Sequence, residues 1–94
     1  MNKYESVVII NPNLEAESVK ALINKFSDLI NTDGKVVSVE ELGKKKLAYE
    51  IKKQTEGYYV IFKFEANPSL ISELERNYRI TDAVMKDIVI REEE

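Results

Sequence analysis

Residues 40–53 read Glu-Glu-Leu-Gly-Lys-Lys-Lys-Leu-Ala-Tyr-Glu-Ile-Lys-Lys, a segment that holds five of the fourteen basic residues of the chain. Three apolar residues within it, Leu47, Tyr49 and Ile51, are spaced by two, the period of a half-buried β-strand. Gly43 precedes them, and a glycine inside an extended segment often marks a bulge. Lysines on such a strand are typical of a sheet edge, where they oppose aggregation. The segment therefore predicts a charged, kinked edge strand.

Two strongly apolar segments predict the central strands of the same sheet. Residues 4–10 are rich in β-branched side chains on both faces and stop at Asn11-Pro12, as a central strand would. Residues 58–65, Tyr-Tyr-Val-Ile-Phe-Lys-Phe-Glu, alternate and predict one core face and one outer face. Residues 54–57, which lie between the basic segment and residues 58–65, are expected to form a four-residue hairpin connection. The side chains expected to face the core are Tyr58, Val60, Phe62 and Phe64, and those expected to face outward are Tyr59, Ile61 and Lys63.

Two amphipathic helices are expected between these strands. Asn13 is a candidate N-cap for the first helix, which ends at Asp33-Gly34. The second helix opens with Asn67-Pro68-Ser69, a cap residue followed by a proline suited to the first turn. Each helix carries one apolar stripe of helical spacing. The stripes are Val19, Leu22, Ile23, Phe26, Leu29 and Ile30 in the first helix, and Leu70, Ile71, Leu74 and Tyr78 in the second.

A last strand is expected over residues 84–90, after a turn at Thr81-Asp82. Alternation along this strand gives it an inner and an outer face. The side chains assigned to the inside are Ile88 and Ile90, and those assigned to the outside are Met85, Asp87 and Val89.

The order of these elements predicts the architecture. Strand, helix, strand, strand, helix, strand is the ferredoxin-like β-α-β-β-α-β pattern of an α+β protein. Right-handed crossovers then give a four-stranded antiparallel sheet in the order 4-1-3-2, with two helices on one face. We expect a single domain over residues 1–94.

The face of the sheet opposite the helices stays open, and four neighbouring apolar side chains form a candidate protein-partner face there, unless loops cover them. These side chains are Val7, Ile9, Tyr59 and Ile61.

The composition argues against most catalytic chemistry. The chain has no His and no Cys, which excludes the usual zinc, iron–sulfur, Ser-His and Cys-His sites. The neighbouring carboxylates Glu40 and Glu41 point to opposite faces of a strand, and residues 92–94 form a solvated acidic end. We therefore expect no enzyme activity, no catalytic residue, no metal, no cofactor and no small-molecule substrate. No signal peptide or membrane-spanning run is evident, so a cytoplasmic protein with no membrane partner is expected.

The charge distribution leaves RNA binding open. A formal net charge of −3 disfavours a free-standing nucleic-acid binder. The lysines at residues 44–46 are nevertheless clustered, and a phosphate-contacting loop and a solvated loop explain them equally well. Similarity to the RNA-recognition motif is poor, because that motif has a basic residue where Glu56 stands and a small residue where Tyr59 stands.

Residues 43–52, Gly-Lys-Lys-Lys-Leu-Ala-Tyr-Glu-Ile-Lys, resemble the signature of the bacterial small-ribosomal-subunit protein S6 family: a glycine, a basic pair, Leu-Ala-Tyr-x-Ile and another basic residue. One departure is Glu50, which stands where many members have proline and restores a backbone donor to the strand. Shorter matches continue along nearly the whole chain, in order and at the family's spacing. They are Tyr4-Glu5, Asn11-Pro12-Asn13, Glu41-Leu42-Gly43, Gly57-Tyr58-Tyr59 and Asp82-Ala83-Val84.

The resemblance implies a ferredoxin-like structural protein of the small ribosomal subunit. It implies that the chain binds the central domain of the small-subunit rRNA as a heterodimer with ribosomal protein S18, a small basic protein that would supply positive charge. The RNA-contacting residues implied by the resemblance are Lys3, Tyr4, Lys86 and Arg91. The RNA-contact candidates added on charge alone are Lys44, Lys45 and Lys46. The residues then expected to anchor the edge strand to the core are Leu47, Tyr49 and Ile51.

Two other functions fit the same fold. A regulatory or ligand-binding ferredoxin-like module would self-associate through the open sheet face, but it needs a glycine-rich or polar ligand loop, and no convincing one is present. An acylphosphatase-like enzyme needs an arginine loop after the first strand to hold phosphate. Residues 11–13 of this chain, Asn-Pro-Asn, contain no arginine.

Overall fold

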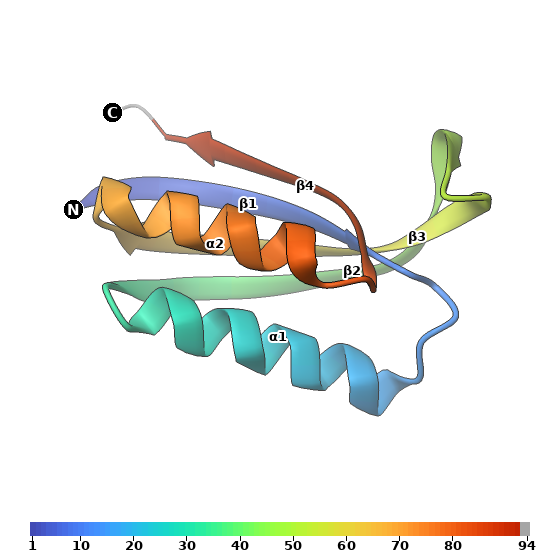
Figure 1. Cartoon of the computed structure of the whole chain (residues 1–94), viewed down its shortest axis with the longest axis horizontal. Coiled ribbons are helices and arrows are strands. Elements are labelled where there is room, and N and C mark those ends of the chain that lie inside the picture. The colour runs from blue at the N-terminus through green and yellow to red at the C-terminus, as the bar shows by residue number, and fades with distance from the viewer. Residues whose placement is uncertain (93–94) are drawn as a thin grey trace.

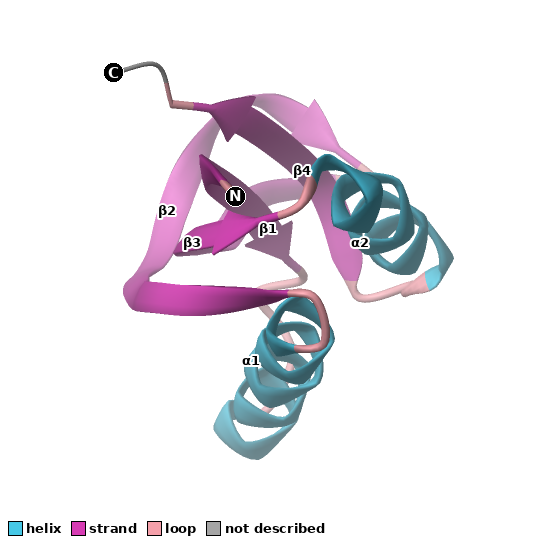
Figure 2. Cartoon of the chain, turned by 90° about the vertical axis from the view of Figure 1, so that its left-hand side faces the viewer, coloured by secondary structure: helices cyan, strands magenta, loops and turns pink. Residues whose placement is uncertain are grey.

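The computed structural model describes residues 1–92 and has the predicted order of elements. These are β1 (Asn2–Ile10), α1 (Ala16–Asn31), β2 (Gly34–Ile51), β3 (Gln54–Ala66), α2 (Pro68–Ile80) and β4 (Val84–Arg91). The strands pair antiparallel in the order β2-β3-β1-β4, and both helices lie on one face of the sheet (Figures 1 and 2). The ferredoxin-like prediction is therefore confirmed, with the two most apolar strands in the centre and the lysine-rich strand at one edge.

The main core lies between the helices and the sheet. Phe26 of α1 meets Tyr78 of α2 and Phe62 of β3 edge to face, with ring centroids 4.7 and 6.4 Å apart. Such pairs contribute about 0.5–1.5 kcal/mol each beyond their buried area. The hydroxyl of Tyr78 lies 2.9 Å from Oγ of Ser6, so the two buried polar groups satisfy each other. The predicted inner face of β3 is confirmed, since its side chains at 60, 62 and 64 are all buried here.

Helix α1 starts later than predicted. Its N-cap is Glu15, with extended backbone angles, and not Asn13. The reason lies in the preceding loop, where the side-chain carbonyl of Asn11 accepts a 2.9 Å hydrogen bond from the backbone N–H of Asn13. This Asx turn holds residues 11–13 outside the helix. The predicted apolar stripe is present, and its buried members are Val19, Ile23, Phe26 and Ile30.

Helix α2 begins where the sequence predicts, with Asn67 at the N-cap position and Pro68 in the first turn. The Asn67 side chain does not cap its own helix. Instead its amide donates a 2.8 Å hydrogen bond to the Asp33 carboxylate, which also accepts one of 3.3 Å from Ser69. The turn after α1 is thereby tied to the start of α2.

The β2–β3 connection is shorter than the four residues predicted. Ile51 pairs with Gln54, so the turn consists only of Lys52 and Lys53. Both have positive φ angles, 48° and 64°, as in the type I′ turns that suit the twist of a hairpin. The prediction was wrong because such turns are normally marked by Asn and Gly, which tolerate this backbone conformation.

Strand β2 is kinked at Gly43, as predicted. Glu41 pairs with Val60 and Gly43 with Tyr59, which leaves Leu42 as an extra residue in a bulge. The φ angle of Gly43 is +79°, a conformation that favours glycine.

A larger irregularity follows near the hairpin tip. Lys46 pairs with Glu56 and Ile51 with Gln54, so residues 47–50 face a single residue of β3. The expected alternation is lost here, and Tyr49 is 62% exposed. The prediction that Tyr49 anchors this strand to the core is therefore wrong. Leu47 is buried and Ile51 half-buried, but in a separate cluster away from the main core.

Beyond the start of β4, its two faces are the reverse of those predicted, whereas Met85 lies on the predicted outer face, packed with Ile9 and Leu47. Ile9 pairs with Lys86 and Ile10 with Val84, so Met85 is an extra residue in a bulge. The bulge shifts the alternation by one residue and turns Val89 toward the main core. Ile88 and Ile90 are consequently 43% and 53% exposed.

Candidate RNA and partner interfaces

The sheet face opposite the helices carries an apolar strip over three strands. Val7 of β1 pairs with Ile61 of β3 on one side and with Ile88 of β4 on the other, and Ile90 follows two residues later on the same face. We call these four residues the open-face strip. Two of them are exposed and two half-buried, so the strip is accessible. The sequence did not identify the β4 members, because no local signal reveals the bulge at Met85.

The β2–β3 hairpin folds over one end of this face. Although β2 and β4 lie at opposite edges of the sheet, Leu47 of β2 packs with Met85 of β4 over Ile9. In Figures 1 and 2 the end of the hairpin bends out of the sheet, away from α1. Ile9, a predicted member of the partner face, is only 6% exposed and lies beneath this cluster. Tyr59, another predicted member, is half-buried against the same cluster.

Polar contacts close the hairpin against β4. Lys52 donates a 3.3 Å hydrogen bond to the backbone carbonyl of Val84, and Lys86 donates one of 2.8 Å to the Tyr49 hydroxyl. The hydrogen bond to Tyr49 raises the pKa of Lys86. Gly57 makes the close packing possible, because a Cβ atom there would overlap Ile9 and come within 3.3 Å of Leu47.

Charged residues border the open-face strip. Glu5 stands opposite Ile90 in β4 and opposite Lys63 in β3. The ammonium nitrogen of Lys63 also lies 3.8 Å from the Glu40 carboxylate. Both side chains are about half exposed, so this ion pair contributes about 0–1 kcal/mol to stability. The strip therefore has a polar rim of mixed sign around an apolar centre, as protein interfaces commonly do.

The predicted RNA-contact residues separate into two groups at opposite ends of the sheet. Arg91 pairs with Tyr4, next to Lys3, whereas Lys86 pairs with Ile9 near the hairpin. Five residues of strand separate the two positions, which is about 17 Å. The predicted RNA-contact residues therefore do not form a single cluster.

The first group surrounds the start of β1. The Tyr4 ring is buried and stacks on Phe64 with centroids 5.6 Å apart, so the ring belongs to the core. Asn2 lies between the other polar groups, donating a 3.3 Å hydrogen bond to the Tyr4 hydroxyl and accepting one of 3.3 Å from Arg91. A cavity of about 270 Å³ adjoins this group. Its lining is Lys3, Tyr4, Val37, Lys63, Phe64, Glu65 and Glu92.

The second group lies on the hairpin. Lys44, Lys45 and Lys46 are exposed and stand opposite Tyr58, Gly57 and Glu56. Within residues 1–92 none of these three side chains makes a hydrogen bond or ion pair. Their ammonium groups are therefore available to external phosphates.

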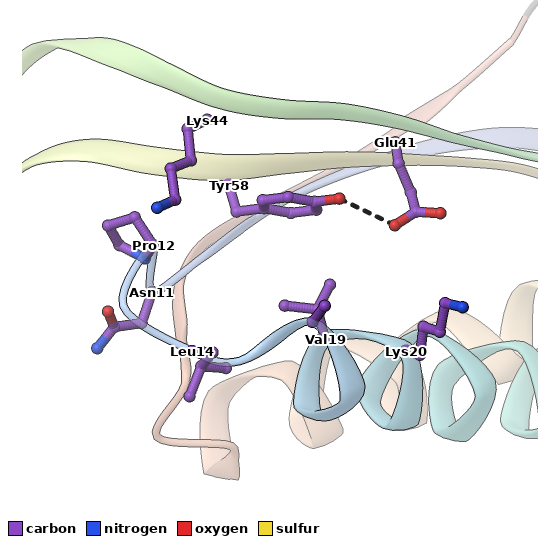
Figure 3. Close-up of a pocket in the computed structure, with 9 residues that line it drawn as sticks. Asn11, Pro12, Leu14, Val19, Lys20, Glu41, Lys44 and Tyr58 are labelled. Carbon is purple, nitrogen blue, oxygen red and sulfur yellow. Dashed lines mark hydrogen bonds between the residues drawn. The ribbon is translucent and has the colours of Figure 1, made fainter.

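A second, larger cavity of about 450 Å³ separates the hairpin from the start of α1 (Figure 3). The Tyr58 side chain crosses this cavity and donates a 2.9 Å hydrogen bond to the Glu41 carboxylate. The pKa of Tyr58 is raised, mainly by burial and to a lesser extent by this hydrogen bond. Lys20 and Lys44 are the basic residues of its lining. Among residues 1–92 no cluster of acidic side chains is arranged to hold a metal ion.

These features define a class of protein: a ferredoxin-like binding domain with an open apolar sheet face and basic groups at both ends of the sheet. Residues 3–91 match the family described as ribosomal protein S6. The small ribosomal subunit protein bS6 of Clostridium perfringens (strain SM101 / Type A) is 48% identical to this chain over 95 residues. The bS6 protein of Clostridium novyi (strain NT) is 50% identical to this chain over 94 residues, and both comparisons cover at least 99% of each of the two proteins compared. The crystal structure of 30S ribosomal protein S6 from Thermotoga maritima superposes with a TM-score of 0.92 at 35% identity, covering 97% of this chain and 87% of that one.

The chain belongs to the ribosomal protein S6 family. The family predicted by the resemblance is therefore confirmed, and with it a structural, non-enzymatic role in the small ribosomal subunit. Neither α1 nor α2, the helices of the described chain, is long and apolar enough to cross a membrane.

Proposed function

We propose that the chain binds the central domain of the small-subunit rRNA as a heterodimer with ribosomal protein S18. The observation that carries the proposal is the open-face strip. Its residues are the exposed or half-buried apolar side chains of Val7, Ile61, Ile88 and Ile90, on the sheet face opposite α1 and α2. A contiguous apolar patch with a polar rim is typical of a protein interface.

The charge of the chain favours joint over independent RNA binding. RNA affinity depends strongly on the number of phosphates that basic side chains neutralise. This chain has a formal net charge of −3, and its basic candidates are divided between two ends of the sheet. A basic partner on the open face would add positive charge between them and lower the repulsion between RNA and the acidic side chains.

We assign the two ends of the sheet to RNA and the strip to the partner. At the start of β1, Lys3 and Arg91 are exposed, and the buried Tyr4 ring would contribute only its hydroxyl. Lys86 and residues 44–46 supply exposed cations at the other end.

A pair of matched substitutions tests the partner assignment. Ile90→Asp places a charge on the open-face strip, whereas Ile80→Asp places one at the end of α2, where the side chain is comparably exposed at 61%. Heterodimer formation with S18 is measured by calorimetry without RNA. We expect Ile90→Asp to weaken the heterodimer by at least tenfold and Ile80→Asp to leave it unchanged.

Equal affinity of both variants would refute the assignment of the strip. Sedimentation of the chain alone checks the alternative, in which the open face mediates self-association. We expect a monomer at micromolar concentration, and an Ile90-dependent homodimer would favour that alternative instead.

A further inference from the structure

We propose that the end of the β2–β3 hairpin is a binding site for an unpaired nucleotide, in which Tyr49 stacks on the base and lysines contact the neighbouring phosphates. The site consists of residues 43–57 and Lys86. It rests on the proposed RNA binding of this chain and adds to it a chemical class of ligand, single-stranded RNA, and an aromatic residue that recognises it.

Tyr49 stands out among the aromatic residues by its exposure. It is 62% exposed, while Tyr4 and Tyr78 are buried and Tyr58 and Tyr59 half-buried. The exposure follows from the backbone, because residues 47–50 face a single residue of β3 and the regular alternation of side chains is lost there. Exposed tyrosines are typical stacking partners for unpaired bases, whose faces are inaccessible in a duplex.

Lys86 fixes the position of the Tyr49 side chain while leaving its ring available. The ammonium nitrogen is 2.8 Å from the hydroxyl oxygen but 5.4 Å from the ring centroid. It therefore lies at the hydroxyl end of the ring and not over its centre. A side chain held in place in this way loses less conformational entropy when a base stacks on it.

The charge around Tyr49 is opposite in sign to that of the whole chain. Residues 43–57 contain five lysines and two glutamates, a net charge of +3, whereas the chain as a whole carries −3. Within residues 1–92 the side chains of Lys45, Lys46 and Lys53 make no hydrogen bond or ion pair. An exposed aromatic ring among uncompensated lysines is the usual composition of a single-strand binding site.

The hairpin turn gives independent support. Lys52 and Lys53 occupy both positive-φ positions of a two-residue turn, where Asn-Gly is the favoured sequence. Backbone strain of this kind is concentrated at functional sites. Lys52 uses its ammonium group to hold the hairpin on Val84, and Lys53 is exposed at the tip.

The same charges disfavour a protein occupant. The proposed protein partner is itself basic and would be repelled by five lysines, whereas the open-face strip offers it apolar contact. A polyanion such as RNA is complementary to the net charge of +3 on residues 43–57. The hairpin end and the strip are therefore assigned to different partners.

The first experiment titrates the isolated chain with a 12-nucleotide single-stranded oligouridylate and follows the Tyr49 ring protons by NMR. We expect their resonances, and those of backbone amides in residues 45–53, to shift more than the resonances of the helices. An RNA duplex of the same length should cause smaller shifts of the Tyr49 ring. Unchanged Tyr49 resonances at saturating oligouridylate would overturn the proposal, and this result does not depend on S18 or on the central domain.

The second experiment measures the affinity of the S18 heterodimer for a central-domain rRNA fragment. Tyr49→Leu should weaken binding by roughly 5- to 150-fold, the effect of losing one stacked base. Tyr49→Phe keeps the ring and loses only the hydrogen bond from Lys86, so it should weaken binding clearly less than Tyr49→Leu. Lys53→Gln should reduce the slope of log affinity against log salt by about 0.7, and Lys25→Gln on α1 should not change it.

The outcomes separate the two proposals. If the wild-type heterodimer binds the fragment no better than S18 alone, the proposed function fails, and the oligouridylate titration still decides whether the hairpin binds RNA. If wild-type binding is normal and Tyr49→Leu equals Tyr49→Phe, only the hairpin proposal fails. If Tyr49→Leu instead weakens the heterodimer without RNA, the hairpin belongs to the protein interface and the proposal is overturned.

Discussion

The ammonium group of Lys52 donates a 3.3 Å hydrogen bond to the backbone carbonyl of Val84, and so joins the tip of the β2–β3 hairpin to the start of β4. Lys52 directly follows β2, the strand at one edge of the sheet, whereas Val84 is the first residue of β4, at the other edge. Their contact exists because the hairpin bends over the open face, where Leu47 packs on Ile9 and Met85. The bend buries one end of the open face and leaves the open-face strip at the other.

Removing this hydrogen bond should loosen the hairpin without unfolding the sheet. Lys52→Met keeps most of the side-chain length but lacks the donor, and we expect a loss of about 0.5–1.5 kcal/mol in the free energy of unfolding. Hydrogen exchange of backbone amides in residues 45–57 should accelerate. Lys53→Met is the matched control, since Lys53 has a similar φ angle but makes no side-chain hydrogen bond within residues 1–92. Equal exchange rates in both variants would show that the contact does not hold the hairpin.

Gly57 is required by the close approach of Ile9 and Leu47. Because an added methyl group would overlap Ile9, Gly57→Ala should destabilise the protein by about 1–3 kcal/mol, as overpacking does. Gly43→Asn is the control, since Gly43 has open space around it and asparagine tolerates its positive φ angle. Urea denaturation should give the larger loss for Gly57→Ala, and the reverse order would contradict the packing described here.

The reversed faces of β4 can be tested on two consecutive residues. Val89 packs against the main core, whereas Ile90 is 53% exposed. We expect Val89→Ala to lower the free energy of unfolding by about 1–2 kcal/mol and Ile90→Ala to lower it by less than about 0.5 kcal/mol. Thermal denaturation of the isolated chain measures both values. A larger loss for Ile90→Ala would restore the faces that simple alternation predicts.

Tyr78 should make the protein sensitive to alkaline pH. Burial raises the pKa of its hydroxyl far above the usual value of 10.0, although the hydrogen bond with Ser6 acts in the opposite direction. Above about pH 10 the unfolded chain loses this proton while the folded chain keeps it, so the stabilisation present below pH 10 is progressively lost as the pH rises. Stability therefore falls with increasing pH in this range.

Substitution of each partner separates this effect from the hydrogen bond. Tyr78→Phe and Ser6→Ala both leave one buried hydroxyl unpaired and should each cost about 1–3 kcal/mol at pH 7. Only Tyr78→Phe should flatten the decline of stability above pH 10, measured by urea denaturation at a series of pH values. An unchanged decline in Tyr78→Phe would assign the alkaline sensitivity to other groups.

The sequence predicts this structure well wherever a strand is regular. The faces of β3 follow from simple alternation because its own residues continue without interruption, and α2 begins at the expected Asn67-Pro68 signal. The element order then defines the sheet, and the signature in residues 43–52 identifies the family.

Irregular backbone accounts for the errors. The extra residue Met85 reverses the faces of β4, so Ile88 and Ile90 were missed as surface residues. The turn at Lys52 and Lys53 lacks the residues that normally mark such a turn, and the excess residues opposite Thr55 expose Tyr49. Each of these features depends on how two strands pair, which local sequence patterns do not encode.

The most direct test of the proposed function is the affinity of a central-domain rRNA fragment for this chain, for S18 and for the two together, measured at one salt concentration. We predict that the pair binds at least tenfold more tightly than S18 alone and that this chain alone binds weakly. Binding by the pair that is no tighter than binding by S18 alone would contradict the proposed function.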